Sequence, residues 1–165
     1  MPTSFAPIVN GESEILVLGS MPGDESLRKR EYYGNPRNQF WRILYSFYGM
    51  EVEKVYENRL AFALEHRIAL WDVIESCQRE GSLDANIREA LPHDFGNLFK
   101  KYPRIHVIAF NGGKAYDVYR RQVGLHLKEG LVYHSLPSTS PANTLRFEDK
   151  LEKWSILRTY LEEHI

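Results

Sequence analysis

The sequence predicts an α/β protein in which four parallel strands form one sheet with helices packed on both of its faces. Four short apolar runs, at residues 14–18, 68–73, 105–110 and 131–136, have the length and composition of buried strands. Segments with apolar residues at helical spacing separate these runs. Strands that alternate with helices along the chain favour a parallel sheet, because each crossover helix covers one face of it.

Five helices are expected between and after the strands. Residues 39–48 repeat apolar side chains every three or four positions, and residues 147–164 do so over the longest stretch. Weaker patterns predict helices at 55–64, at 87–101 with an interruption at Pro92, and at 114–123. No repeat, linker or low-complexity tract divides the 165 residues, so we expect one domain, residues 1–165.

The composition excludes several classes of protein. No apolar stretch approaches the ~20 residues needed to span a bilayer, and residues 1–11 lack the layout of a signal peptide. The single cysteine, Cys77, excludes a disulfide framework and a cysteine-ligated metal centre. The six histidines show no metal-binding spacing. We therefore expect a cytoplasmic protein with no metal and no cofactor.

The charge balance does not by itself indicate a nucleic-acid-binding protein, because the formal net charge is −1. Basic residues nevertheless gather in clusters, of which Arg28, Lys29 and Arg30 form the densest, while acidic residues gather near the C-terminus. Such a chain can present a basic face to a polyanion. An ordinary mixed surface is the alternative that charge alone leaves open.

Unusual sequence stands at the end of each expected strand. GSMPG (19–23) follows the first, Asp72 stands in the second, NGG (111–113) follows the third, and SLPSTSPAN (135–143) runs on from the fourth. The carboxyl ends of parallel strands lie at one edge of a sheet, which is where ligands bind in open α/β folds. These four segments are therefore expected to meet at one crevice.

The connection from the first strand to the helix at residue 39 is long, at about twenty residues where ~2–6 suffice. Connections of that length often carry function. Gly19 and Gly23 would let backbone N–H groups approach a ligand, although a structural turn explains them as well. Tyr33 could stack on a nucleic-acid base for ~1–3 kcal/mol, or pack as a half-buried aromatic side chain.

Polar residues in three of these segments each allow two interpretations. Asn38 is either the N-cap of the following helix, worth ~1 kcal/mol, or an amide that holds a water or a substrate. Asp72 is either a structural carboxylate or a group that binds a ligand. The PSTSP segment (137–141) is either a donor-rich loop for phosphate oxygens or a turn that caps a helix.

Taken together, the segments LGSMPG, YYGNPRNQFW and LPSTSPAN resemble the uracil-DNA glycosylase superfamily, and within it the hypoxanthine-DNA (deoxyinosine) glycosylase branch. The resemblance covers nearly the whole chain. It implies an α/β/α sandwich around a four-stranded parallel sheet. It also implies a metal-independent enzyme that excises a deaminated base from DNA and leaves an abasic sugar.

The resemblance also implies roles for particular residues around the flipped base. Gly19, Ser20, Met21 and Gly23 match the motif that lines the base pocket. Met21 stands where many relatives carry the Asn or Asp that positions water, so this role passes to Asn38. The residue matching the aromatic that stacks on the base is Tyr33. Asp72 lies near the position at which relatives form hydrogen bonds to the edge of the base.

Further residues are expected to contact DNA. The 138–141 segment matches the motif that pinches phosphates and inserts into the duplex, although Thr139 and Ser140 are small for a wedge. The residues expected to contact the DNA are Ser138, Thr139, Ser140, Asn143, Arg28, Lys29 and Arg30. The expected partner is DNA that contains deaminated bases, bound by a monomer.

Other functions remain open at this stage. The enzyme could act mainly on uracil or on mismatched bases, because sequence does not show the size of the pocket. A non-catalytic nucleic-acid-binding module of the same fold is a second alternative. A hydrolase that uses Ser20 or Ser138 as nucleophile is disfavoured, because no G-x-S-x-G segment is present.

Overall fold

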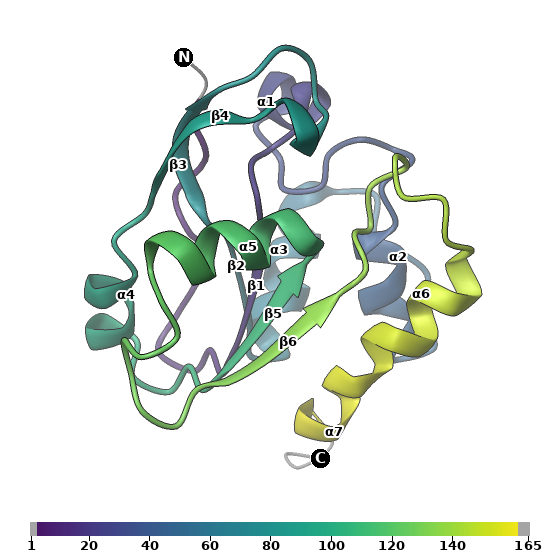
Figure 1. Ribbon diagram of the computed structural model, residues 1–165. Coiled ribbons are helices and arrows are strands. Elements are labelled where there is room, and N and C mark those ends of the chain that lie inside the picture. Colours follow the sequence, from purple (N-terminus) through teal and green to yellow (C-terminus); the bar gives the residue numbers. More distant parts are fainter. Residues whose placement is uncertain (1–2, 162–165) are drawn as a thin grey trace.

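The computed structural model describes residues 3–161, and its centre is a four-stranded parallel sheet (Figure 1). The strand order is β2-β1-β5-β6. Every neighbouring pair in this sheet is parallel. The strands are β1 (Ile15–Gly19), β2 (Ile68–Asp72), β5 (Val107–Asn111) and β6 (Val132–Leu136). The predicted sheet is confirmed, with strand ends within two residues of those expected.

Two apolar cores cover the two faces of the sheet, because alternate residues of a strand point to opposite sides. Ile15 and Val17 of β1 belong to one core, and Leu16 and Leu18 to the other. The first core packs against α2 (Phe40–Ser46), α3 (Tyr56–Glu65), α6 (Phe147–Trp154) and α7 (Arg158–Leu161). The second packs against α4 (Phe95–Lys101) and α5 (Gly113–Gln122). The α/β/α sandwich is confirmed.

A second, two-stranded antiparallel sheet was missed by the sequence analysis. It pairs β3 (Ile74–Gln78) with β4 (Arg88–Pro92), and its connection holds the short 3-10 helix η1 (Asp84–Asn86). The helix expected over 87–101 is therefore wrong before residue 95. Leu91 precedes a proline, which disfavours helical backbone there, and Ile87 is buried while Leu91 is exposed.

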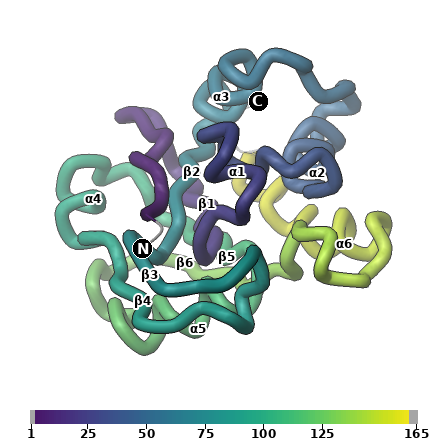
Figure 2. The backbone as a smooth tube through the Cα atoms, turned by 90° about the horizontal axis from the view of Figure 1, so that it is seen from above, coloured from purple at the N-terminus to yellow at the C-terminus, as the bar shows by residue number. Residues whose placement is uncertain are grey.

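The long connection after β1 also contains a helix that the sequence analysis missed, α1 (Asp24–Lys29). It carries only one large apolar residue, Leu27, so it shows no apolar periodicity. Viewed from above, α1 and the β3–β4 hairpin are neighbours over the sheet (Figure 2). The hairpin connection contacts the start of α1, where Ser82 accepts the Asp24 N–H. Both segments therefore lie near the carboxyl end of β1.

The C-terminal helix is less regular than expected. It divides into α6, a 3-10 turn η2 (Ser155–Leu157) and α7, and the expected residues 162–164 lie outside the described range. Within residues 3–161, no helix has both the length and the apolar character required to cross a membrane.

Candidate active site

A cavity of about 570 Å³ opens where the four strands of the parallel sheet end. Every strand contributes, through Gly19 at the end of β1, Asp72 in β2, Asn111 in β5 and the loop that follows β6. The predicted residues that line the cavity are Gly19, Ser20, Met21, Gly23, Tyr33, Asn38, Asp72, Ser138, Thr139, Ser140 and Asn143. The expected crevice is thus present, and residues more than a hundred positions apart in sequence meet in it.

Asn38 lies on the cavity wall at the end of a chain of hydrogen bonds. Its Oδ1 accepts the Phe40 N–H at 3.0 Å and the Thr139 hydroxyl at 2.8 Å. The Thr139 hydroxyl in turn accepts from Asn111 Nδ2 at 2.9 Å, and Asn111 Oδ1 accepts the Thr139 N–H at 2.9 Å. The N-cap of α2 is Gln39, so Asn38 is not the N-cap itself; its oxygen instead accepts the N–H of Phe40, the first residue of α2, while Asn38 also lines the cavity.

The expected contact of Thr139 with DNA is corrected by its position. Its side chain has 0 % exposure, and its hydroxyl is bonded between two asparagines inside the protein. A side chain in this environment cannot reach a phosphate. Thr139 instead joins the loop after β6 to the start of α2, and its carbonyl accepts the Gln39 N–H at 3.0 Å.

Ser138, Ser140 and Asn143 keep positions compatible with a role at the surface of the 138–143 loop. Each is half-buried. The Ser138 and Ser140 hydroxyl oxygens accept the N–H groups of residues 140 and 142, at 3.2 and 3.1 Å. Each hydroxyl proton is left to donate to another partner, so this loop fits the donor-rich interpretation of PSTSP.

Two residues of α6 donate hydrogen bonds to the 137–143 segment, and the sequence analysis had placed neither at the site. Lys150 is 1 % exposed, and its ammonium donates to the carbonyls of Ser140 at 3.4 Å and Asn143 at 3.0 Å. Trp154 donates its indole N–H to the Pro137 carbonyl at 2.9 Å. Burial lowers the pKa of Lys150. Only the tertiary structure shows that this lysine packs inward.

Tyr33 faces the cavity in a strained backbone conformation. Its φ of 55° lies in the left-handed region that non-glycine residues rarely adopt. Its ring packs against Phe40 with the centroids 4.3 Å apart. The neighbouring Tyr32 is buried and donates its hydroxyl to the Ala6 carbonyl at 2.7 Å. Of the two tyrosines, Tyr33 is thus the one suited to stack on a base.

Asp72 lies deep in the cavity, only 4 % exposed, and its Oδ2 has no hydrogen-bond partner among residues 3–161. Burial raises the pKa of this carboxyl to about 7; the nearby Asp84 raises it further, while Arg79 acts in the opposite direction. Gly19 makes room for it: a Cβ at that position would come within 2.6 Å of Asp72 Oδ1 and 3.2 Å of the Tyr33 hydroxyl.

The raised pKa of Asp72 has a consequence for stability. Between the ordinary value of 3.8 and about 7, the folded protein keeps a proton that the unfolded chain has lost. Stability conferred by the protonated form is therefore present at low pH, declines as pH rises through this window, and levels off above it. The two pKa values differ by about 3, which at about 1.4 kcal/mol per unit corresponds to about 4 kcal/mol.

We accordingly expect the Asp72→Asn variant to gain melting temperature relative to the unmodified protein as pH rises from 4.5 to 7.5 (about the window given by the two pKa values). The difference between the two proteins isolates Asp72 from all other titrations. A difference that stays constant across this range would show that Asp72 is ionised throughout.

The β3–β4 hairpin forms one rim of the cavity through Ser82, Leu83 and Asp84, and the sequence analysis missed all three. Ser82 accepts the Asp24 N–H at 2.8 Å, and the Ser20 hydroxyl donates to Asp84 at 2.6 Å. No histidine is among the residues that line the cavity in the described part of the chain, so the serine–histidine pair typical of serine hydrolases is absent from this lining.

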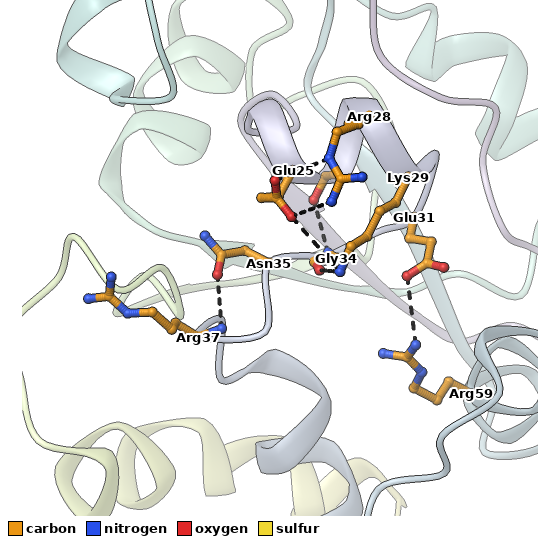
Figure 3. A network of polar contacts seen from close by, with 9 residues as sticks. Glu25, Arg28, Lys29, Glu31, Gly34, Asn35, Arg37 and Arg59 are labelled. Atoms are coloured by element: carbon orange, nitrogen blue, oxygen red, sulfur yellow. Dashed lines mark hydrogen bonds and ion pairs between the residues drawn. The ribbon is translucent and has the colours of Figure 1, made fainter.

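The basic cluster Arg28, Lys29 and Arg30 lies outside the residues that line the cavity. As Figure 3 shows, the Arg28 guanidinium forms an ion pair with Glu25, with 2.8 Å between Nη2 and Oε2. The Lys29 ammonium donates to the Gly34 carbonyl at 2.9 Å. The Arg28–Glu25 pair is exposed, and water and salt screen such surface pairs so that they contribute little to stability. Both side chains could therefore exchange these partners for a phosphate at little cost.

Neutralising Arg28, Lys29 and Arg30 together to glutamine is expected to weaken binding to every duplex alike and to make the salt dependence of binding shallower. Fluorescence anisotropy at several salt concentrations measures both effects. The matched control neutralises Arg120 and Arg121 on α5, which are likewise exposed, ion-paired and outside the cavity lining. If both sets of variants bind equally well, the 28–30 cluster lies outside the interface.

Within residues 3–161, no group of three or more histidine, cysteine, aspartate or glutamate side chains is arranged to hold a metal ion. The lining of the cavity offers four asparagine amides, two tyrosines, four carboxyl groups and several hydroxyl and backbone donors. This set can bind a planar, polar ligand and orient it.

Comparison with known proteins agrees with this architecture. The family model of the uracil DNA glycosylase superfamily matches residues 6–162, and the chain belongs to that superfamily. A protein of Methanosarcina acetivorans described as hypoxanthine DNA glycosylase is 39% identical over 153 residues, which cover 91% of this chain and 93% of that protein. One of Methanosarcina barkeri with the same description is 36% identical over 154 residues, covering 92% and 94%.

A solved structure supports the same conclusion. A solution NMR structure from Methanosarcina acetivorans, described as a proposed uracil DNA glycosylase, superimposes with a TM-score of 0.83 at 37% identity. The superposition covers 97% of this chain and 98% of that one. The resemblance inferred from the three sequence segments is confirmed.

Proposed function

We propose that this protein is a monofunctional DNA glycosylase that flips a deaminated base, preferentially hypoxanthine, out of DNA. It hydrolyses the N-glycosidic bond of that base and leaves an abasic site for base excision repair. The observation that carries the proposal is the cavity in which Asn38, Tyr33 and Asp72 meet, in a chain whose relatives are described as hypoxanthine DNA glycosylases.

The first step is the extrusion of the base, because atoms inside a duplex are out of reach of the enzyme; this costs a few kcal/mol. The 138–143 loop contacts phosphates on one side of the cavity through Ser138, Ser140 and Asn143. On the other side, the basic residues 28–30 add electrostatic attraction. The flipped base then stacks on Tyr33.

Breaking the N-glycosidic bond builds positive charge on the sugar and negative charge on the leaving base. Backbone groups of residues 19–23 and the amide of Asn38 surround the cavity in which that negative charge develops. Fixed dipoles of this kind stabilise a transition state without reorganisation. Water captures the sugar cation, so orientation matters more than strong base catalysis. Asn38 is the proposed catalytic residue.

Asp72 is the proposed reader of the base edge. Hypoxanthine presents an N1–H donor beside its O6 acceptor, and the carboxyl can accept the N1 proton. Adenine has an acceptor at N1, so Asp72 repels it above about pH 7, where the carboxyl is ionised. Because Gly19 has no side chain, the edge of the base can come close to the carboxyl.

The test is an excision panel on labelled duplexes that carry hypoxanthine, uracil or xanthine, with adenine and guanine as undamaged controls. The proposal expects alkali-labile abasic sites, with hypoxanthine cleaved fastest. Fastest release of uracil would assign the protein to the alternative function, a uracil glycosylase. Tight binding without release of any base would identify a non-catalytic nucleic-acid-binding module. The proposal also includes a monomer acting in the cytoplasm as a single domain, which sedimentation and fractionation test.

Stacking on Tyr33 makes a separate prediction. Every base has a π-face, so Tyr33→Phe is expected to leave excision largely intact, whereas Tyr33→Ala should slow it by about tenfold for hypoxanthine and uracil alike. Both variants keep a side chain at the same positive φ, so they share the backbone strain of the original residue. Single-turnover rates on the two substrates measure the effect, and an alanine variant with unchanged rates would remove Tyr33 from the binding of the base.

A further inference from the structure

The hydrogen bonds around Asn38 fix which atom of its amide faces the cavity. The Phe40 N–H can only donate, so the atom of Asn38 that it contacts must be the oxygen. The Thr139 N–H likewise identifies the Asn111 oxygen, which leaves the Asn111 NH₂ to donate to the Thr139 hydroxyl. Two backbone donors thus determine the orientation of both amides.

The direction of the remaining bond follows. The Thr139 hydroxyl accepts from Asn111, so its own proton goes to the acceptor 2.8 Å away, Asn38 Oδ1. Asn38 Oδ1 then accepts two hydrogen bonds, which uses both of its lone pairs. Among residues 3–161, Asn38 Nδ2 has no hydrogen-bond partner, although it is not one of the buried unpaired atoms. The donor is therefore the half of the amide left for a ligand.

We propose that Asn111 and Thr139 are positioning residues that lock Asn38 so that it presents an N–H donor, and not its carbonyl, to the flipped base. This inference rests on the proposed function and refines the role of its catalytic residue. It differs from the sequence-based expectation that Asn38 positions water, and the carbonyl oxygen of Asn38 is already occupied.

A donor at this position suits the chemistry of the leaving base. Negative charge grows on the base as the N-glycosidic bond breaks, and a hydrogen bond from a fixed N–H strengthens as that charge grows. A hydrogen bond donated to the attacking water would instead occupy one of the lone pairs of the nucleophile. The structure thus assigns Asn38 to the leaving group.

The network is also buried enough to act as a rigid support. Thr139 is 0 % exposed and Asn111 is 6 % exposed, and they lie on different strand ends, 28 positions apart in sequence. The interaction with Thr139 reaches Asn38 across 101 positions. Displacing a reacting group by about 1 Å can cost about a hundredfold in rate, so loss of this support should be visible in catalysis.

The first test changes only the hydroxyl. Thr139→Val is expected to lower the single-turnover rate of hypoxanthine excision about 10- to 100-fold with little change in DNA affinity, whereas Thr139→Ser should restore it. Thr159→Val, which removes an exposed hydroxyl that does not line the cavity, is the matched control and should excise normally. A Thr139→Val variant with the original rate, or a serine variant as slow as valine, would overturn the proposal.

The second test stands even if Thr139→Val does not fold. Asn38→Asp keeps an oxygen for Phe40 and Thr139 but replaces the outward NH₂ with an acceptor. It should be inactive at neutral pH. Its rate relative to the unmodified protein should rise about tenfold per pH unit from pH 7.5 to 5.5, as protonation restores a donor. Taking the ratio removes the titration of Asp72 from the comparison.

An Asn38→Asp variant that excises well at pH 7.5 would show that an acceptor is needed, and the proposal would fall. These outcomes are separate from failure of the proposed function itself. In that case the unmodified protein would release no base from any duplex, and the variants would have no rate to change.

Discussion

Replacing Asn38 by alanine is expected to cut hypoxanthine excision about a hundredfold or more while leaving DNA binding nearly unchanged. The side chain lines the cavity, and loss of one positioned hydrogen-bonding group in a transition state has effects of about this size. Single-turnover kinetics at saturating enzyme give the rate, and anisotropy with the same duplex gives the affinity.

The variant will also lose stability, and this must be measured beside the rate. Alanine removes an acceptor from the Phe40 N–H and from the Thr139 hydroxyl, which together are worth about 1–3 kcal/mol. Thermal unfolding reports that loss. If Asn38→Ala melts earlier but excises at the original rate once folded, Asn38 is a helix cap and no more.

Strands β1, β2 and β5 were predictable because their residues are buried on both faces of the sheet, whereas β6 is mostly exposed or half-buried. Each of these three strands has five residues, and all of them are buried. Such strands appear in the sequence as short, continuous apolar runs, which can be recognised by their length. The meeting of their carboxyl ends then follows from parallel topology alone. The sequence therefore predicted the location of the cavity more reliably than it predicted the helices and strands that surround the cavity.

The β3–β4 hairpin was not predictable in the same way. Ile87 and Leu91 lie four positions apart and imitate a helical stripe, but only Ile87 is buried. The two strands pair with shifts in register, so neither shows clean alternation. As a result the residues of the rim, Ser82 and Asp84, were missed although they contact Asp24 and Ser20.

Contacts made by polar side chains inside the protein could not be predicted from the sequence either. A threonine between two serines looks like a surface donor, yet Thr139 is fully buried between two asparagines. Lys150 belongs to an acidic helix and looks solvated, yet its ammonium lies beneath the 138–143 loop. Both roles depend on partners brought together only by the fold.

Asp72 is the residue at which substrate choice is expected to change most sharply. Asp72→Ala removes the acceptor for the N1–H of hypoxanthine, and loss of a hydrogen bond that involves a charged group costs about 1.5–3 kcal/mol, or about 10- to 150-fold in rate. We expect this loss to exceed the one caused by Tyr33→Ala, since stacking does not distinguish one base from another.

Asp72→Asn is the matched control, because asparagine keeps the shape of the side chain and can both accept the N1–H and donate to O6. It should therefore retain most of the excision of hypoxanthine that alanine loses. Above about pH 7 adenine should stay uncleaved by the unmodified protein, because an ionised carboxylate then faces the acceptor at N1.

The competing explanation is that Asp72 only supports the cavity, and the same two variants decide between the explanations. A structural carboxyl would make excision fall in step with melting temperature, equally for every substrate. Asp72→Asn removes a buried ionisable group with an unpaired oxygen, so it should melt no earlier than the unmodified protein at pH 7.5. Alanine that slows hypoxanthine release in a well-folded protein, while asparagine does not, would establish that the carboxyl contacts the edge of the base. Equal rates for all three proteins would exclude it.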